Sequence, residues 1–133
     1  MTRRVVIDTN VIISAALSDA GNPAKILRMV DAHRLQVYYS LDILSEYADV
    51  LSRGKFNFSP EKQAEFLDRV QDLGVLISPV TSTIPLPDET DRIFYDAAKA
   101  AEAILITGNT KHYPAKPFIM TPAAFLASVK MHL

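Results

Sequence analysis

Three of the 15 acidic side chains stand at separated points, close to apolar segments that are typical of a folded core. Asp8 follows the apolar run Val5–Ile7, Glu46 has apolar neighbours, and Asp91 closes the acidic segment Asp88–Asp91. Clustered carboxylates repel one another and raise one another's pKa unless a cation holds them together. Oxygen ligands without cysteine or paired histidines select hard ions such as Mg²⁺ or Mn²⁺. The acids could therefore form a metal site, provided that the fold brings them together.

Each acid also has an ordinary structural interpretation. Asp8 could cap the helix that follows it, with Asn10 as an alternative cap, and Glu46 could be a solvated helix residue. Asp91 could be the partner of a cap at Asp88, or an acid favoured by the positive end of the helix dipole. No acid indicates a site by itself, so the interpretation depends on where the predicted topology places them.

The hydrophobic pattern predicts a parallel sheet covered by helices on both faces. Five short apolar runs are typical of strands in such a sheet: Val5–Ile7, Val37–Tyr39, Val75–Ile77, Ala103–Ile106 and Phe118–Met120. Capping residues followed by proline mark three helix starts: Asn22-Pro23, Ser59-Pro60 and Thr121-Pro122. After Pro60 the helical period places Ala64, Leu67, Val70 and Gln71 on the inner face. Ser40 is expected to cap a fourth helix, and Asp88 or Thr90 a fifth.

This order of elements predicts a three-layer α/β/α sandwich with a central, mostly parallel sheet of about five strands. The connection from Ile106 to Phe118 is the doubtful step, because it is short for a parallel crossover. The 133 residues suit one domain, residues 1–133, and the absence of cysteine excludes disulfides and cysteine-based zinc sites. His33 is expected on a surface helix and His132 in the tail.

The bulk composition limits the classes of function. The net charge of −1 argues against a generally basic nucleic-acid binder, but not against an enzyme that meets phosphates through metal ions. No apolar run approaches the roughly 20 residues that span a bilayer, and the N-terminus lacks a signal-peptide pattern. We expect a protein of the cytoplasm without a membrane partner.

Ligands of open parallel sheets bind beyond the carboxyl ends of the strands. The predicted topology delivers Asp8 to this edge after the first strand, Asp91 before the fifth helix, and Thr107-Gly108-Asn109 after the fourth strand. Glu46 lies inside the helix after the second strand, on the border of its buried stripe. Asn109 after glycine is usually a turn residue. The convergence of these polar groups nevertheless predicts a metal site at this edge.

Four segments resemble a known family. They are "VVIDTNVIISAAL", "SLDILSEYADVL", "LPDETDRIFYDAAKAAEAILITGNTKHYP" and "IMTPAAFL". They resemble a PIN domain, and more narrowly the bacterial and archaeal PIN proteins grouped as toxins of type II toxin–antitoxin systems. The resemblance covers nearly the whole chain, in the right order and spacing. It implies a metal-dependent ribonuclease that hydrolyses RNA phosphodiester bonds.

By position, Asp8, Glu46 and Asp91 match the first, second and third acids of the family, and we expect them to be the catalytic ligands of Mg²⁺ or Mn²⁺. The family often has a fourth acid where this chain has Asn109, which offers an oxygen but no charge. Asp88 could supply some of the missing charge. This departure leaves a second interpretation open: a PIN fold with a weakened site, acting as an RNA- or protein-binding module.

Supporting roles follow from the same resemblance. Thr9 and Asn10 are expected to fix Asp8 and its turn, and Thr107 and Asn109 to orient a ligand or water.

Three basic residues near the acids, Lys111, His112 and Arg92, are candidate phosphate contacts. Lys111 and His112 could equally lie in a solvated loop, and Arg92 could instead pair with an acid. The implied partners are RNA, a small antitoxin protein and possible second copies in a homodimer. The segment Arg53–Lys62 carries Phe56 and Phe58, which could pack on the core or belong to a partner surface.

Overall fold

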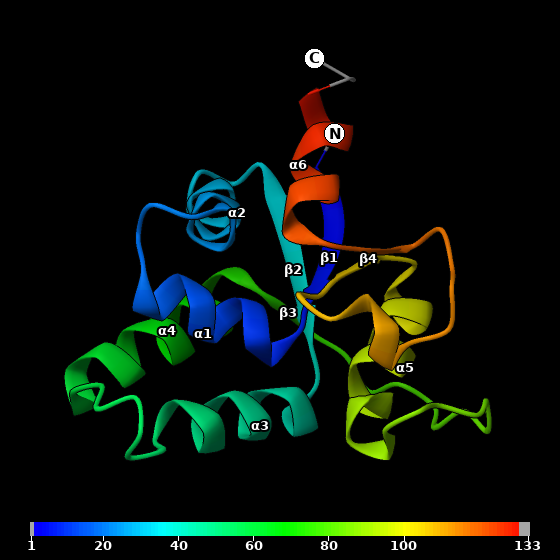
Figure 1. Ribbon diagram of the computed structural model, residues 1–133, viewed down its shortest axis with the longest axis horizontal. Helices are drawn as coiled ribbons and strands as arrows, with labels where there is room; N and C mark the ends of the chain where they lie inside the picture. The colour runs from blue at the N-terminus through cyan, green and yellow to red at the C-terminus, as the bar shows by residue number, and fades with distance from the viewer. Residues whose placement is uncertain (1, 131–133) are drawn as a thin grey trace.

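The computed structural model describes residues 2–130 and has the predicted α/β/α architecture (Figure 1). Its strands are β1 (Arg3–Ile7), β2 (Leu35–Tyr39), β3 (Val75–Leu76), β4 (Ile104–Ile106) and β5 (Ile119–Met120). Its helices are α1 (Thr9–Leu17), α2 (Asn22–Asp31), α3 (Leu41–Leu51), α4 (Pro60–Leu73), α5 (Arg92–Ala101) and α6 (Pro122–Lys130), with 3-10 turns η1 (Glu89–Asp91) and η2 (Thr110–His112). The sheet order is β3-β2-β1-β4-β5, and all strand pairings among the described residues are parallel.

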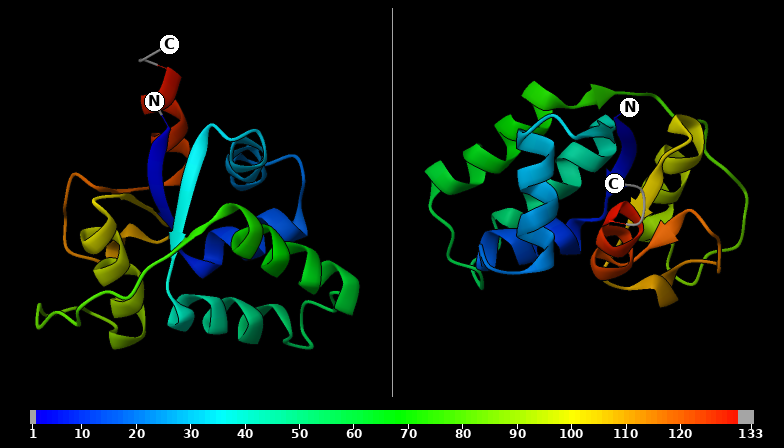
Figure 2. Two further views of the ribbon diagram at one scale, coloured as in Figure 1. Left: turned by 180° about the vertical axis from the view of Figure 1, so that it is seen from behind. Right: turned by 90° about the horizontal axis from the view of Figure 1, so that it is seen from above.

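Helices cover both faces of the sheet. Helices α1, α2 and α4 lie on one side and α5 on the other (Figure 2), and α6 contacts α2. The central strand β1 is consequently buried, with Val5, Val6 and Ile7 at most 1% exposed. Helix α3 follows β2 and lies below the sheet in Figure 1, at the end where the strands finish. The elements that flank the strand ends are therefore α3 and the starts of α1 and α5.

The predicted helix starts are confirmed for α3, α4 and α6, whereas α5 has Asp91 and not Asp88 or Thr90 at its cap position. The hydroxyls of Ser40, Ser59 and Thr121 each accept a hydrogen bond from a backbone N–H three residues later, at 3.1–3.2 Å. These bonds satisfy N–H groups that the helix leaves without a partner. The prediction for α2 is wrong by one residue, since the helix begins at Asn22 itself and Gly21 occupies the capping position. Proline tolerates this second helical position as well, because the N–H there also lacks an intrahelical acceptor.

The predicted inner face of α4 needs correction. Phe66 and Val70 are buried, whereas Ala64 and Gln71 are exposed. The aromatic ring at Phe66 removes far more apolar surface from water than the methyl group of Ala64 would. The helix therefore turns the face with the larger side chain toward the sheet.

Strand β3 also departs from the prediction. The run Val75–Ile77 was expected to be covered on both faces, but β3 has only two residues, which are 39% and 51% exposed. The strand lies at the edge of the sheet, where fewer elements can cover it. Ile77 lies outside the strand, although its N–H donates to the carbonyl of Tyr39 at 2.8 Å.

The short connection from β4 to β5 does make a parallel crossover. Leu105 and Thr107 donate backbone hydrogen bonds to Phe118 and Met120, at 2.8 and 3.0 Å. The crossover contains only η2 and irregular chain. It passes the carboxyl ends of the strands, so its residues lie at the edge where ligands were expected.

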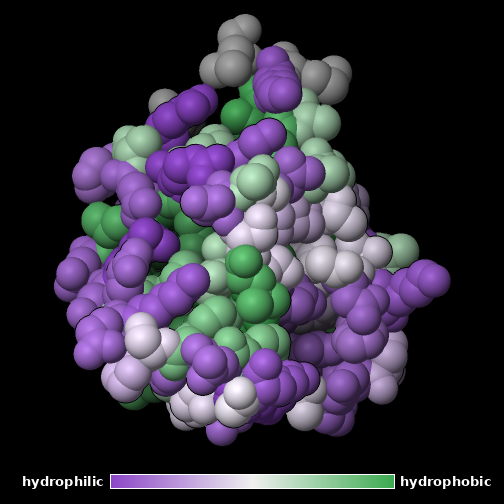
Figure 3. Space-filling view, turned by 60° about the vertical axis from the view of Figure 1, so that its left-hand side comes forward, coloured by the Kyte–Doolittle hydropathy of each residue, from purple (hydrophilic) through white to green (hydrophobic). Residues whose placement is uncertain are grey.

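The surface outside the strand ends has few specific features. Phe56 and Phe58 are half-buried, pack against the core and stack on each other with centroids 5.5 Å apart, which favours the core interpretation of this loop. The face around α1, α2 and α4 mixes apolar and charged side chains (Figure 3), with a groove of about 830 Å³ between these helices. His33 is exposed just after α2, whereas His132 lies outside the described residues. Among the described helices, none has the length and apolar character needed to cross a bilayer.

Candidate active site

Strands β1 and β4 bring Asp8 and Thr107 together. The strands are adjacent and parallel, with Ile7 opposite Ile106, and the N–H of Asp8 donates to the Ile106 carbonyl at 2.9 Å. The next residue of each strand therefore leaves the sheet beside the other. The Thr107 hydroxyl donates to Oδ2 of Asp8 at 2.9 Å. The sheet register thus fixes the first acid of the site.

Asp8 and Asp91 both occupy the N-cap position of a helix, α1 and α5 respectively. Within the described part of the chain, neither carboxylate accepts a capping hydrogen bond. Both carboxylates therefore gain from the positive helix end, but their oxygens are left to other partners. Asp8 thus has the position of a cap, while its Oδ2 accepts hydrogen bonds from Thr107 and Tyr113.

Asp8 is nearly buried, at 6% exposure, and its Oδ2 also accepts a hydrogen bond from the Tyr113 hydroxyl at 2.8 Å. Burial raises the pKa of Asp8, and the hydrogen bonds from Thr107 and Tyr113 partly counteract it. Sequence reasoning missed Tyr113, whose pKa is raised in turn by burial and by the charge of Asp8. It also missed Tyr47, whose buried hydroxyl donates to the carbonyl of Ile7.

The expected supporting residues do bond around Asp8. The Thr9 hydroxyl lies 3.2 Å from Oε2 of Glu46, to which it donates, so the half-buried Glu46 is tied to the turn after β1. The Asn10 amide donates to the Thr107 hydroxyl at 3.4 Å and accepts from the N–H of Gly108 at 2.9 Å. The turns after β1 and β4 are therefore linked by side chains.

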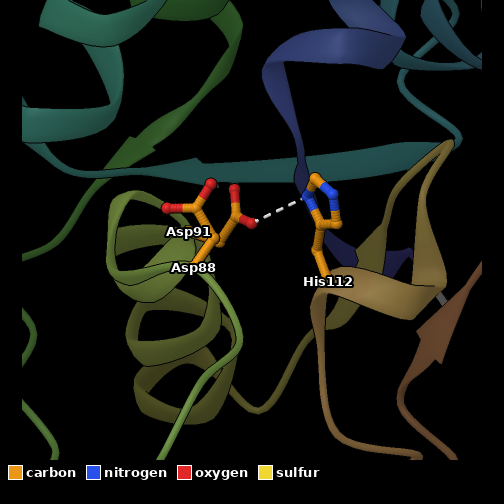
Figure 4. Close-up of side chains that lie close together, drawn as sticks. All are labelled: Asp88, Asp91 and His112. Atoms are coloured by element: carbon orange, nitrogen blue, oxygen red, sulfur yellow. Dashed lines mark ion pairs between the residues drawn. The ribbon is translucent and has the colours of Figure 1, made fainter.

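A second group of candidate ligands lies at the start of α5. Possible ligand atoms of Asp88, Asp91 and His112 all lie within 4.8 Å of one another (Figure 4). Asp88 comes from the segment before η1, where it accepts from the N–H and hydroxyl of Thr90 at 3.0 and 2.8 Å. Those bonds lower the pKa of Asp88. Among residues 2–130, Asp8 and Glu46 do not belong to a group as tight as this one.

Asp91 is the most perturbed acid of the site. Burial and then the charge of Asp8 raise its pKa to about 6, against 3.8 for an ordinary aspartate. Its Oδ2 is 3.1 Å from Nδ1 of His112 but, within residues 2–130, this buried oxygen has no aligned hydrogen bond. A carboxylate whose pKa is raised by burial and by the charge of another acid is suited to a cation, which could be the protonated His112 ring or a metal ion.

The other predicted residues of this edge take different positions. The Asn109 amide nitrogen lies 2.8 Å from Nε2 of His112, and Lys111 is exposed. The Arg92 guanidinium pairs with Glu89 at 2.6 and 2.8 Å. It also donates to the carbonyls of Ser82 and Ile84, at 3.0 and 2.7 Å. Arg92 thus pairs with an acid, one of its two expected roles, and phosphate contact by these basic residues stays a prediction.

Comparisons with known proteins give the chain a family context. The sequence pattern of the PIN domain matches residues 4–111. The chain is also similar to an uncharacterized protein of Methanocaldococcus jannaschii, with 35% identity over 109 residues. This match spans 80% of the chain and 70% of the archaeal protein. The matched PIN region contains every candidate acid described above.

Proposed function

This chain belongs to the PIN domain family, and from its site we propose that it is an endoribonuclease dependent on Mg²⁺ or Mn²⁺. PIN domains are generally nucleases and typically bind divalent metals. The observation that carries the proposal is the group of Asp88, Asp91 and His112, whose possible ligand atoms lie within 4.8 Å of one another, together with the charge of Asp8, which raises the pKa of Asp91. We assign the activity to a single domain that comprises residues 1–133.

The donor set fits the ion that the family implies. The ligands would be Asp8, Glu46 and Asp91, with Asp88 and Asn109 in weaker roles. Carboxylate and amide oxygens suit hard divalent ions. The buried Oδ2 of Asp91 supplies the structural support, because within the described chain it lacks the hydrogen bond that a buried carboxylate oxygen normally has.

When bound, a divalent ion lowers the pKa of its water and neutralises charge that develops on the phosphate oxygens. The residues of this chain position the ligands. Thr107 and Tyr113 hold one oxygen of Asp8, which leaves the other oxygen available. Thr9 holds one oxygen of Glu46 in the same way. Lys111 is exposed at this edge and could contact an RNA phosphate.

The test of the activity is cleavage of a labelled single-stranded RNA with Mn²⁺ or Mg²⁺. We expect cleavage by the wild type, loss with EDTA, and loss in Asp8→Asn. Asp72→Asn is the matched control, because Asp72 is an exposed residue of α4. Cleavage that persists in purified Asp8→Asn protein would overturn the assignment and point to a contaminating nuclease.

Asn109 favours one alternative function, a binding module whose metal site has weakened. Melting temperatures discriminate the two functions, because an ion that binds the folded state stabilises it. A rise with millimolar Mn²⁺ or Mg²⁺ that is lost in Asp91→Asn supports the nuclease. No rise in the wild type would favour the binding module.

We further propose the finer biological role that the sequence resemblance implies. In this role the protein is the toxin of a toxin–antitoxin pair, acts in the cytoplasm, forms homodimers and is blocked by a small antitoxin protein. Induced expression in a bacterium should then arrest growth, and Asp8→Asn should relieve the arrest. Growth at the normal rate with abundant active wild type would contradict the toxin role but leave the nuclease proposal intact.

A further inference from the structure

The residue at the position of the family's fourth acid contacts a histidine. Nδ2 of Asn109 is 2.8 Å from Nε2 of His112, and the other ring nitrogen, Nδ1, is 3.1 Å from Oδ2 of Asp91. The His112 ring therefore bridges Asn109 to the third acid. Resting on the proposed metal-dependent function, we infer that His112 is a nitrogen ligand of the metal ion, and that Asn109 is the positioning residue that orients its ring.

The distance between His112 and Asp91 suits two ligands of one ion. An ion with octahedral ligands at about 2.1 Å holds neighbouring ligand atoms about 3 Å apart. The 3.1 Å between Nδ1 and Oδ2 matches this separation, and in the absence of an ion the same distance makes an ion pair when the ring is protonated. Figure 4 shows the imidazole ring directed at the Asp91 carboxylate, with Asp88 beside it.

The Asn109 amide can form a hydrogen bond with either tautomer of the neutral His112 ring. With its nitrogen toward His112, the amide donates to Nε2, and the neutral ring then carries its proton on Nδ1. With its oxygen toward His112, the amide accepts a hydrogen bond from Nε2–H, and the lone pair of Nδ1 is free to bind the ion. The two amide orientations differ by a rotation that exchanges oxygen and nitrogen. Histidines that bind a metal through one ring nitrogen commonly donate a hydrogen bond from the N–H of the other, as in the second orientation.

This arrangement explains why asparagine can replace an acid at this position. The fourth ligand comes from His112, three residues later on η2, and Asn109 contributes the hydrogen bond behind it. An imidazole ligand shifts the preference of an oxygen-rich site toward transition metals. The site should therefore favour Mn²⁺ over Mg²⁺ more strongly than a site of four carboxylates would.

The experiment measures Mn²⁺ binding to the purified, ion-free protein by calorimetry and by electron spin-echo spectroscopy, which detects nitrogen bound to Mn²⁺. We expect a nitrogen signal in the wild type that disappears in His112→Ala, together with weaker Mn²⁺ binding by about tenfold or more. His112 is 46% exposed, so its replacement should leave the fold intact, and circular dichroism checks this. Lys111→Ala is the matched control, and it should keep both the nitrogen signal and the Mn²⁺ affinity.

Two variants of Asn109 test its positioning role. Asn109→Asp keeps an acceptor for Nε2–H, so it should retain the nitrogen signal and bind Mn²⁺ at least as tightly as the wild type. Asn109→Ala removes the acceptor and should lower the Mn²⁺ affinity by about ten- to a hundredfold. An unchanged affinity in Asn109→Ala would overturn this role.

The outcomes separate this inference from the proposed function. Mn²⁺ binding without a nitrogen signal, or with equal affinity in His112→Ala, would overturn the inference and leave the nuclease proposal standing. A wild type that binds no Mn²⁺ or Mg²⁺ would overturn both.

Discussion

Replacing Asp91 by asparagine should stabilise the ion-free protein at neutral pH. Burial and the charge of Asp8 raise the pKa of Asp91 to about 6 from 3.8, so the folded state binds its proton more tightly than the unfolded state. The stabilising contribution is complete below pH 3.8 and is lost as the pH rises through about 6. At 1.36 kcal/mol per pKa unit, the loss at pH 7 amounts to about 3 kcal/mol. The Asp91 side chain is only 13% exposed, so solvent screens this effect little.

The wild type should regain part of the stability that Asp91 costs at pH 7 when the pH is lowered to 5. Between pH 7 and pH 5, the linkage relation gives Asp91 about 1 kcal/mol of recovered stability. Asparagine cannot titrate, so the advantage of Asp91→Asn over the wild type should shrink by this amount. The measurement is urea unfolding in EDTA at both pH values, followed by circular dichroism. Asp72→Asn on the exposed face of α4 is the control.

If the free energy of unfolding of Asp91→Asn exceeded that of the wild type by the same amount at pH 7 and pH 5, the pKa of Asp91 would not be raised by folding. A wild type that loses stability relative to the variant on acidification would refute the raised pKa more directly, because the sign would then be opposite.

Three further predictions concern other parts of the fold. Tyr113→Phe removes a donor to the Asp8 carboxylate, so the pKa of Asp8 should rise further and stability at pH 7 should fall by about 1–3 kcal/mol, as NMR titration and urea unfolding can measure. Gly74→Ala should lower the melting temperature, because the added Cβ would collide with the backbone carbonyl oxygen of Val70. Gly54→Ala is the control, since no atom lies within 4 Å of the new Cβ, and it should change stability by at most about 0.5 kcal/mol. Arg92→Gln should speed hydrogen exchange in the irregular segment before η1, whose carbonyls Arg92 holds. Equal exchange in both proteins would contradict that role.

The candidate site residues that lie next to the end of a strand or the start of a helix could be predicted from the sequence. Asp8 closes an apolar run and Asp91 precedes a helical period, and both patterns are local. Tyr113 could not be predicted, because a buried aromatic residue normally indicates core packing and its partner Asp8 is 105 positions away. The position of His112 between Asp91 and Asn109 depends on the path of the crossover, which no periodicity reports.

The fold shows the same division. The strands and most helix caps have local signals, so the topology was correct even at the short crossover from β4 to β5. The predictions for α4 and β3 were wrong because one sequence pattern is compatible with more than one helix face or strand position. Helical spacing allowed Ala64 to face inward, although Phe66 does so, and an apolar run does not tell whether β3 is central or at an edge. Both outcomes depend on packing between elements that are distant in the sequence.

The crossover from β4 to β5 concentrates much of the site in one short stretch of chain. Between Thr107 and Tyr113 lie both hydroxyl donors to Asp8, the amide that meets His112, and the imidazole itself. The three acids, in contrast, come from separate elements whose packing maintains the core. The segment from Thr107 to Tyr113 could therefore be replaced by another segment of the same length. Such an exchange would change the hydrogen bonds to Asp8 and the ring beside Asp91, while the strands and helices that carry the acids would stay the same.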